Sequence, residues 1–185
     1  MQTKTTTSTH YISTIPSPLG ELTIASDGEC LTGLWLAEQK YFMANVGATE
    51  HMPDLPVFLE TRTWLEVYFT GEDPGPIPAV NPQGTEFRRR VWEMLAEIPY
   101  GHLATYGELA QRIAAERGVT KMSSRAVGGA VGHNPISIIV PCHRVVGSNG
   151  SLTGFGGGIA RKIQLLELEG IDMSRLTIPT KGTAL

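Results

Sequence analysis

"TYGELAQRIAAERGVTKMSSRAVGGAVGHN", residues 105–134, contains two helical patterns separated by a short turn. Thr105 and Glu108 have the spacing of a capping box, which places Tyr106 at the first position of a helix. The polar stretch "ERGVTKM" is typical of a turn and ends this helix. The stretch therefore predicts two short helices joined by a tight connection.

The second helix has Ser123 or Ser124 as its N-cap. A longer amphipathic helix is predicted before the pair, in "TEFRRRVWEMLAEIPYG", and the arginines at 88–90 lie mostly off its apolar face. They indicate either a solvated face or phosphate contact. Three helices in this order predict a helix-turn-helix or its winged variant.

The second helix of the pair is rich in glycine. Each of its glycines costs about 1 kcal/mol of helix stability relative to alanine, so some other feature must offset the loss. One possibility is tight helix–helix packing. The other is a smooth surface of Ala126, Gly129 and Ala130 that approaches a groove closely, with Arg125 projecting from the start of the helix. Both possibilities remain open at this point.

The first third of the chain has a different pattern. "HYISTI", "ELTIAS" and "CLTGLWL" are rich in β-branched and apolar residues and are separated by turn signals, which predicts a small antiparallel sheet. "LPVFLETRTWLEVYFTG" then predicts a helix, with an apolar face of Val57, Leu59, Trp64, Leu65, Tyr68 and Phe69.

The stretch at residues 71–84 has four prolines and three glycines, a composition typical of a linker. We therefore predict two domains. Residues 1–80 form an N-terminal α/β domain, and residues 81–185 form a C-terminal helical domain.

Charge is distributed unevenly between the two parts. The formal net charge of the 185 residues is −3, but residues 1–84 carry −7 and residues 85–185 carry +4. The basic half permits a phosphate-binding face. No apolar run approaches the ~20 residues of a membrane span, and the start has no apolar segment typical of a secretory signal. We expect a cytoplasmic protein that does not bind membranes.

Only two cysteines are present, too few for a disulfide framework. Cys30 lies among strand residues, and we interpret it as a small buried hydrophobe. Cys142 lies between a proline and His143, after the apolar run "ISIIV", which we expect to be a buried strand that delivers the thiol from its end. A cation beside a thiol lowers its pKa and favours the nucleophilic thiolate.

Packing, metal binding and nucleophilic catalysis are the alternatives for Cys142. Metal binding fits poorly, because no pair of cysteines or histidines has zinc-ligand spacing. A papain-type hydrolase would use Cys142, His143 and Asn134, but the local signature around the cysteine of such enzymes is absent.

Three segments together resemble one protein family. "RAVGGAVGHNP" at 125–135, "PCHRV" at 141–145 and "GFGGGIARKIQLLELEG" at 154–170 are similar to the O6-alkylguanine-DNA alkyltransferases, or methylated-DNA–protein-cysteine methyltransferases. "YISTIPSPLGELTIASDGECLTGLWL" resembles the N-terminal domain of the family more loosely. Because it has no cysteine-rich metal module, the chain resembles the stand-alone bacterial form of the family. The resemblance implies a ribonuclease H-like N-terminal domain and a C-terminal winged helix-turn-helix domain that binds DNA and accepts the alkyl group.

The resemblance also implies roles for particular residues. Cys142 would accept the alkyl group, while His143, through a water and Glu169, would remove its proton. Asn134 would organise the turn that holds the cysteine, and Tyr106 would help protonate the leaving guanine oxygen.

Other positions would contact DNA or the flipped base. Arg125 would fill the gap left by that base, and the backbone of Cys142 and Val145 would meet its exocyclic amine. The expected contacts in the groove and at the pocket wall are Ser123, Ser124, Ala126, Gly129, Phe155 and Gly156.

The expected reaction is repair of double-stranded DNA that contains O6-alkylguanine, with O4-alkylthymine as a further substrate. It would occur once per molecule, without cofactor or metal, because a thioether has no good leaving group. We expect a monomer and leave cooperative binding along DNA open. Two alternatives are an alkyltransferase-like protein that binds lesions without transfer, against which "PCHRV" argues, and a winged-helix transcription factor with a preferred DNA sequence.

Overall fold

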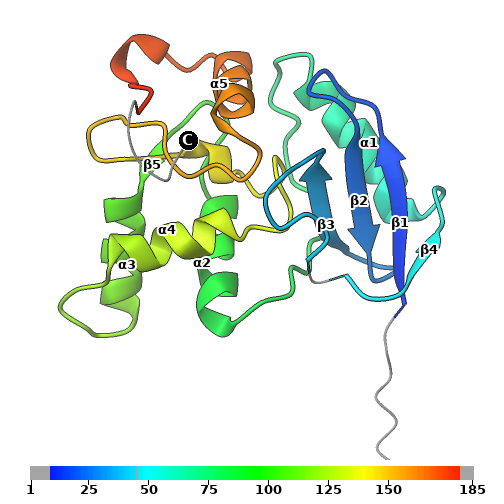
Figure 1. The fold of residues 1–185 in the computed structure, drawn as a ribbon, viewed down its shortest axis with the longest axis horizontal. Coiled ribbons are helices and arrows are strands. Elements are labelled where there is room, and N and C mark those ends of the chain that lie inside the picture. The colour runs from blue at the N-terminus through cyan, green and yellow to red at the C-terminus, as the bar shows by residue number, and fades with distance from the viewer. Residues whose placement is uncertain (1–8, 45, 180–185) are drawn as a thin grey trace, which may run out of the picture.

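The computed structural model describes residues 9–44 and 46–179, which form a sheet lobe and a helical lobe side by side (Figure 1). The sheet lobe contains β1 (His10–Ile15), β2 (Leu22–Ser26), β3 (Leu31–Leu36), β4 (Thr49–His51) and α1 (Pro56–Tyr68). The helical lobe contains α2 (Glu86–Ala96), β5 (Ala104–Thr105), α3 (Tyr106–Glu116), α4 (Ser124–Gly132), the 3-10 helix η1 (Cys142–Arg144), β6 (Val145–Val146), α5 (Ile159–Leu168) and η2 (Met173–Arg175).

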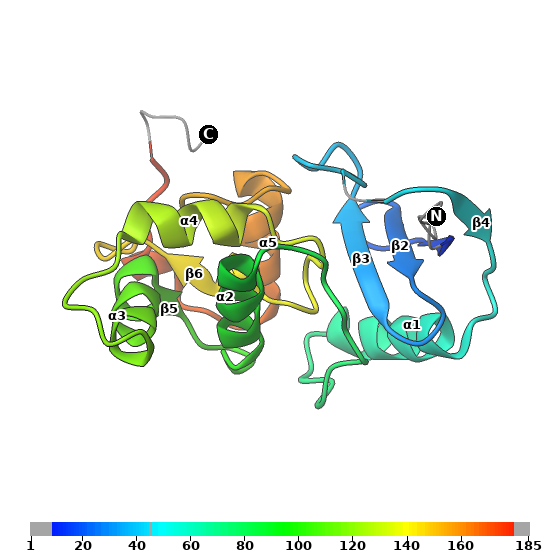
Figure 2. The same ribbon diagram turned by 90° about the horizontal axis from the view of Figure 1, so that it is seen from below.

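The sheet has the strand order β3-β2-β1-β4. The three predicted strands pair antiparallel, which confirms that part of the prediction, and β4 adds to β1 in parallel. The short strand β4 is exposed throughout and has no apolar alternation that a sequence pattern could detect. Helix α1 lies along one face of the sheet, and β3 is the strand beside the helical lobe (Figure 2).

Helix α1 begins with Pro56 in its first turn, where a missing N–H costs nothing. Most of the predicted apolar face is buried, but Leu59 is 49% exposed and does not belong to it. Phe58 occupies that place in the core, because it follows Val57 on the buried side of the first turn.

The proline-rich stretch at residues 71–84 is neither helix nor regular strand, as predicted, but it is attached to the sheet. Leu31 donates its backbone N–H to Ala79, and Asn81 donates to Leu31, at 2.8 and 2.7 Å. Val80 thereby forms a parallel bridge with Leu31 at the start of β3.

In the helical lobe, α3 and α4 form the predicted helix-turn-helix pair. The capping box of Thr105 and Glu108 is present in both directions, and Tyr106 is the first residue of α3. Of the two candidate N-caps of α4, Ser123 is the one whose side chain accepts from the backbone, at Ala126. The short strands β5 and β6 pair in parallel beside these helices.

The expected strand at "ISIIV" is wrong, since residues 136–140 form buried turns. Only Ile136 pairs with a strand, through one bridge to Leu34 of β3. Ile138 has φ of 71°, a conformation that a strand excludes and that β-branched residues rarely adopt. Cys142 therefore comes from a tightly wound loop rather than from the end of a strand.

The two lobes share one hydrophobic core. The largest cluster of buried residues includes Leu34 of β3, Tyr68 of α1, Trp92 of α2 and Val140 of the turn before η1. Leu34 also donates to Pro135 and accepts from Ser137, at 2.8 and 2.9 Å, so the backbone of β3 is hydrogen-bonded directly to the helical lobe. The contacts and hydrogen bonds hold the lobes in a defined relative position.

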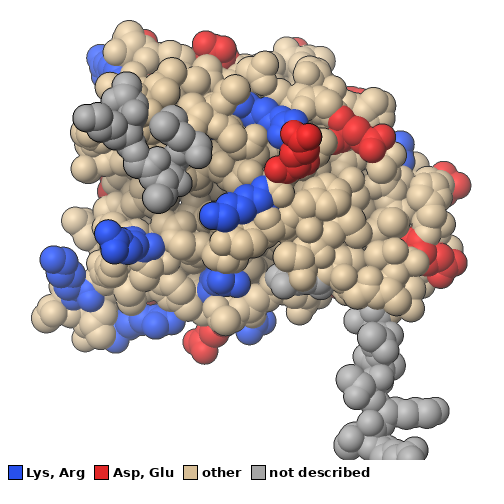
Figure 3. All heavy atoms as spheres, in the orientation of Figure 1, with Lys and Arg blue, Asp and Glu red and all other residues tan. Residues whose placement is uncertain are grey.

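The surface charges follow the division of the chain. On the face drawn in Figure 3, Lys and Arg gather over the helical lobe, and Asp and Glu are more frequent toward the sheet lobe. Among the residues that the structure describes, no helix has the length and apolarity to cross a membrane.

The contribution of the capping box to the stability of α3, the helix that begins with Tyr106, can be tested by mutation. Thr105→Ala removes the side chain that accepts from Glu108, and we expect it to lower the free energy of unfolding by about 1 kcal/mol. Urea denaturation monitored by circular dichroism measures the change. Thr120→Ala, at an exposed position in the turn before α4, is the control and should have no measurable effect. Equal stability of both variants would contradict the assigned cap.

Candidate functional site

Cys142 is the first residue of η1, and its residue exposure is only 4%. The side-chain amide of Asn134 donates to its Sγ at 3.1 Å. The same amide donates to the carbonyl of Val140 at 2.7 Å, and its oxygen accepts from the backbone of Ile136 at 3.0 Å. Asn134 thus fastens the turn of residues 136–140 and orients the thiol with one side chain.

Burial dominates the electrostatics of the thiol. It raises the pKa of Cys142, while the Asn134 hydrogen bond and the nearby charge of Lys162 act in the opposite direction. Lys162 is itself fully buried, and its Nζ donates to the carbonyls of Val145 at 2.5 Å and Thr153 at 2.9 Å. Burial lowers the pKa of Lys162 to about 8. Cys142 is therefore a protonated thiol at neutral pH, with a polar environment able to support a developing charge.

His143 and Glu169 form a buried pair behind the cysteine. Nε2 of His143 lies 2.6 Å from Oε1 of Glu169, the residue that caps the C-terminus of α5. Burial lowers the pKa of His143, so its imidazole is neutral at neutral pH. Burial opposes ionisation of Glu169, but hydrogen bonds from His143 and Arg144, together with the charge of Arg144, outweigh it and lower the pKa of Glu169 to about 2. The residue after Cys142 in η1 is therefore a neutral base that is paired with an ionised carboxylate.

The other ring nitrogen of the imidazole is available. Because Nε2 faces a carboxylate, it carries the proton, which leaves Nδ1 as the acceptor. Nδ1 of His143 is buried and has no hydrogen-bond partner among the described residues. A buried acceptor without a protein partner is rare in native proteins, and such an atom commonly takes part in catalysis or binds a water molecule.

Tyr106 packs behind two glycines, Gly128 and Gly154, that line a surface pocket. Its ring lies beneath Gly128 of α4, and its hydroxyl beneath Gly154, since added Cβ atoms there would meet them at 3.7 and 2.6 Å. The hydroxyl donates to the carbonyl of Thr153 at 2.9 Å. Burial and the neighbouring Cys142 raise the pKa of Tyr106 to about 12, so the phenol keeps its proton. Tyr106 and Cys142 are thereby brought together.

This pocket, which is lined by neither Tyr106 nor Cys142, has a volume of about 420 Å³. Phe155 and Gly156, predicted as wall residues, line it together with glycines of α4. The sheet lobe supplies a further part of the wall, through Glu38, Lys40 and Tyr41. The backbone of Lys40 donates to Gly156 at 3.0 Å.

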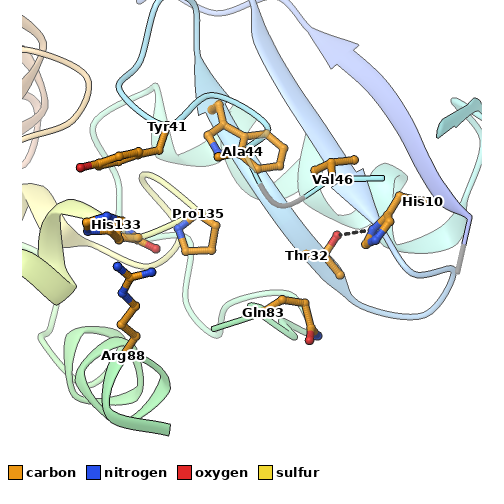
Figure 4. A pocket seen from close by; sticks show the side chains of 11 residues that line it. His10, Thr32, Tyr41, Ala44, Val46, Gln83, Arg88, His133 and Pro135 are labelled. Carbon is orange, nitrogen blue, oxygen red and sulfur yellow. Dashed lines mark hydrogen bonds between the residues drawn. The ribbon is translucent and has the colours of Figure 1, made fainter. Parts of the chain in front are cut away.

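Tyr41 stacks on His133, the C-cap residue of α4, with ring centroids 4.0 Å apart. Figure 4 shows this stack, with Arg88 of α2 pointing toward it from below. The stack also lines a separate cavity of about 130 Å³ between the lobes. The loop that carries Tyr41 therefore holds the end of α4 against the sheet lobe.

The exposed side of α4 is smooth and carries one cation. Ser123, Ser124, Arg125, Ala126 and Gly129 are all exposed. Ala130, expected on the same surface, is buried, and its carbonyl accepts from the indole of Trp92 at 2.9 Å.

An added Cβ at Gly129 or Gly132 would meet nothing within 4 Å, whereas at Gly128 it would contact the ring of Tyr106. A contact at 3.7 Å is ordinary van der Waals packing, so packing inside the protein requires glycine at none of these three positions. The glycines favour instead an open, smooth surface.

The interpretation of Cys30 as a buried hydrophobe is wrong. It lies in the turn before β3 and is only partly buried, because its backbone N–H is held by the side chain of Asp27 at 2.8 Å. The turn places Cys30 outside the core that the strands on either side of it share.

Several residues of the site escaped the sequence analysis. Arg144 donates to both oxygens of Glu169, Tyr68 donates to one of them, and Gln39 accepts from Ser137 across the two lobes. Arg144 and Lys162 are charged side chains within apolar segments, and this is the sequence signal that could have indicated their place in the site. No pattern in the sequence links Tyr68 or Gln39 to residues about a hundred positions away. Among residues 9–44 and 46–179, no cluster of His, Cys, Asp and Glu could hold a metal ion.

A helix-turn-helix beside a small sheet, with a buried cysteine followed by a histidine that pairs with a carboxylate, is the arrangement expected of a DNA-binding protein with a candidate reactive thiol. The sequence comparisons agree. Residues 10–75 match the 6-O-methylguanine DNA methyltransferase ribonuclease-like domain, and residues 86–171 match the DNA-binding domain of the same family. The chain therefore belongs to the 6-O-methylguanine DNA methyltransferase family, which confirms the resemblance and the predicted fold class.

Two relatives named methylated-DNA–protein-cysteine methyltransferase illustrate the similarity. The protein of Haemophilus influenzae is 48% identical over 87% of this chain and 87% of its own length. That of Mycobacterium tuberculosis strain H37Rv is 48% identical over 86% of this chain and 92% of its own. The crystal structure of Mycobacterium tuberculosis OGT in complex with DNA has a TM-score of 0.72 and 43% identity, covering 91% of this chain and 94% of that one.

The buried carboxylate gives a test through the pH dependence of stability. Glu169→Gln leaves the charge of Arg144 uncompensated, and we expect the free energy of unfolding to fall by about 3 kcal/mol at pH 7. A carboxyl whose pKa is lower in the folded chain stabilises the fold above its unfolded pKa of about 4.3. That stabilisation is lost as the pH falls toward the folded pKa of about 2.

The difference between wild type and Glu169→Gln should therefore shrink below about pH 4. Urea denaturation over a pH series measures it. Glu167→Gln, at an exposed position on α5, is the matched control and should follow the wild type throughout. A difference that stays constant down to low pH would contradict the ionised state of Glu169.

Proposed function

We propose that this chain repairs alkylated DNA by transferring the alkyl group from O6 of guanine to its own Cys142. The observation that carries the proposal is the hydrogen bond from Asn134 to Sγ, in a chain of this family, beside the His143–Glu169 pair. The first contact holds the thiol at a fixed position, and the second belongs to a base in the adjacent residue. O4-alkylthymine presents an alkyl group on a comparable exocyclic oxygen and is proposed as a second substrate.

The proposed reaction begins with the removal of the thiol proton. The pKa of Cys142 is raised, so the thiol must lose its proton as the substrate reacts. The proton passes through a bridging water to the free Nδ1 of His143, and the ionised Glu169 stabilises the imidazolium that forms. The thiolate then attacks the alkyl carbon, the carbon–sulfur bond forms, and the carbon–oxygen bond to guanine breaks.

The guanine that leaves the alkyl carbon receives a proton from Tyr106. Tyr106 keeps its phenolic proton at neutral pH. Its hydroxyl would exchange the Thr153 carbonyl for guanine O6 and give up this proton, and it would regain one from solvent as His143 releases the thiol proton. The products are S-alkylcysteine and an intact guanine. Because a thioether has no good leaving group, each molecule reacts once and needs no cofactor.

The pocket would hold the base by its wall and by backbone groups. Phe155 and Gly156 bound one side. The backbone of Cys142 and Val145, which does not line the pocket in this structure, is proposed to meet the exocyclic amine of the bound base. The carbonyl of Val145 already accepts from Lys162, so the amine would use its second lone pair.

Access to the base requires that the nucleotide leaves the stack, which costs a few kcal/mol. The smooth, exposed side of α4 supports entry into the minor groove, with Arg125 filling the gap that the base leaves. Ser123, at the start of the helix, together with Ser124, Ala126 and Gly129, would contact the groove. The basic C-terminal half supports contact with phosphates whatever the sequence.

We further propose that the chain works as a monomer, with the domains meeting at residues 80 and 81. As a repair protein it would work where the chromosome lies, which is the cytoplasm in a cell without a nucleus.

Mass spectrometry of the intact protein after incubation with an O6-methylguanine duplex tests the chemistry. The expected result is a gain of one methyl group per chain that peptide mapping assigns to Cys142. A methyl group on any other residue would overturn the assignment.

Cys142→Ser should abolish transfer and leave binding to the duplex intact, as measured by fluorescence anisotropy. Loss of binding in a folded variant would show instead that the cysteine serves the structure of the DNA-binding lobe.

Arg125→Ala tests base flipping. We expect repair of duplex DNA to slow by about tenfold or more, which corresponds to a barrier about 1.4 kcal/mol higher. Reaction with free O6-benzylguanine should be unchanged, because that substrate needs no flipping. Lys121→Ala removes a nearby exposed charge and is the control, which should weaken binding without slowing transfer at saturating DNA. Equal losses of Arg125→Ala on both substrates would argue against the flipping role.

A further inference from the structure

Tyr68 is the last residue of α1 in the sheet lobe, but its hydroxyl lies inside the cluster behind Cys142. It donates to Oε1 of Glu169 at 2.7 Å and lies 3.3 Å from Nε2 of His143. The residue has no solvent exposure, and its ring stacks on Trp64 with centroids 5.4 Å apart. The position of the hydroxyl is therefore set by the packing of the sheet lobe.

The groups around His143 come from several elements. The titratable or charged residues that act on it in the described chain are Glu169 at the C-cap of α5, Lys162 of α5, Arg144 of η1 and Tyr68 of α1, and Cys142 precedes it in the chain. Tyr100 lies behind Tyr68, edge-on to its ring at 6.0 Å, and Phe155 packs edge-on against the imidazole. Within this set, Tyr68 is the contribution of the N-terminal domain.

Oε1 of Glu169 is shared between donors. His143, Tyr68 and Arg144 all bond to it, at 2.6, 2.7 and 3.0 Å. A carboxylate oxygen that accepts a further hydrogen bond is less basic toward each of its partners. The hydroxyl of Tyr68 is also near enough to accept from the imidazole, but at 3.3 Å this contact is much weaker than the bond to Glu169. The net effect of the Tyr68 hydroxyl is therefore to lower the basicity of the Glu169 carboxylate toward His143.

We propose that Tyr68 is a positioning residue of the proton relay, which holds the Glu169 carboxylate and limits the basicity that it confers on His143. The inference rests on the proposed transfer to Cys142, in which a neutral imidazole accepts the thiol proton. Without the hydroxyl, Glu169 stabilises the imidazolium more strongly, so His143 is protonated and unable to accept a proton at a higher pH. The N-terminal domain thus tunes the chemistry of a site in the other domain.

Tyr68→Phe tests the proposal, because it removes one oxygen and keeps the ring in its stack. The rate of transfer from free O6-benzylguanine is measured against pH, and the titration of His143 is followed by NMR. We expect the acid limb of the rate profile and the His143 titration to move together to higher pH by about one unit. The rate on the acid limb then falls by about tenfold, while the plateau at higher pH stays within about twofold of wild type.

Tyr100→Phe is the matched control. It removes a phenolic hydroxyl from the same aromatic cluster, but this hydroxyl donates to the backbone of Leu168 at 3.2 Å and not to the carboxylate. Its acid limb should coincide with that of wild type.

Tyr68→3-fluorotyrosine, introduced site-specifically, should shift the acid limb in the opposite direction. A more acidic phenol is a stronger donor to Glu169, so the limb should move to lower pH. This variant retains both the hydroxyl and the ring, and it tests the proposal even where the phenylalanine variant folds poorly.

An acid limb and a His143 titration that match wild type in both variants would overturn the role of Tyr68, whatever the loss of stability. Failure of the proposed function itself would be recognised separately. In that case the wild-type protein would acquire no alkyl group on Cys142, while the NMR titration would still report the effect of Tyr68 on His143.

Discussion

The site depends on one buried negative charge, the carboxylate of Glu169. It accepts five hydrogen bonds, from Tyr68, His143, the backbone of Gly101 and twice from Arg144. Burying a carboxylate costs several kcal/mol unless its oxygens are fully satisfied. The donors come from α1, from the segment before β5 and from η1, so satisfying this one group requires the lobes and the reactive turn to come together. Docking of the two domains and assembly of the site are therefore one physical event.

The loop that carries the cysteine is rigid for a related reason. Asn134 replaces backbone pairing that a strand would have supplied, by bonding to Ile136 and Val140 on either side of Ile138. Its remaining donor reaches Sγ of Cys142. The side chain that closes the turn thus also orients the thiol, which explains how a positive φ at a β-branched residue is tolerated inside the core.

The surface for DNA and the buried site meet at α4. Its glycines weaken the helix in isolation, yet they leave its exposed side smooth and bring Gly128 against the ring of Tyr106 on the inner side. The helix is held at its N-terminus by the Ser123 cap and at its C-terminus by the stack of Tyr41 on His133. Contacts at both ends therefore offset the low helix propensity of a segment that is proposed to lie between the DNA groove and the reactive pocket.

The sequence alone determined the features that depend on short-range periodicity and capping: the three main strands, the helix-turn-helix pair with its Thr105–Glu108 box, and Cys142 beside His143 as the reactive candidate. Local patterns could not show that residues 136–140 turn rather than extend, since the turn depends on the Asn134 amide and on a bridge to Leu34. They could not link Tyr68 to Glu169, 101 positions away, or place Arg144 and Lys162 in the interior. Only the tertiary structure decides these contacts, because the energy of a buried charge or hydroxyl depends on partners that folding brings from distant parts of the chain.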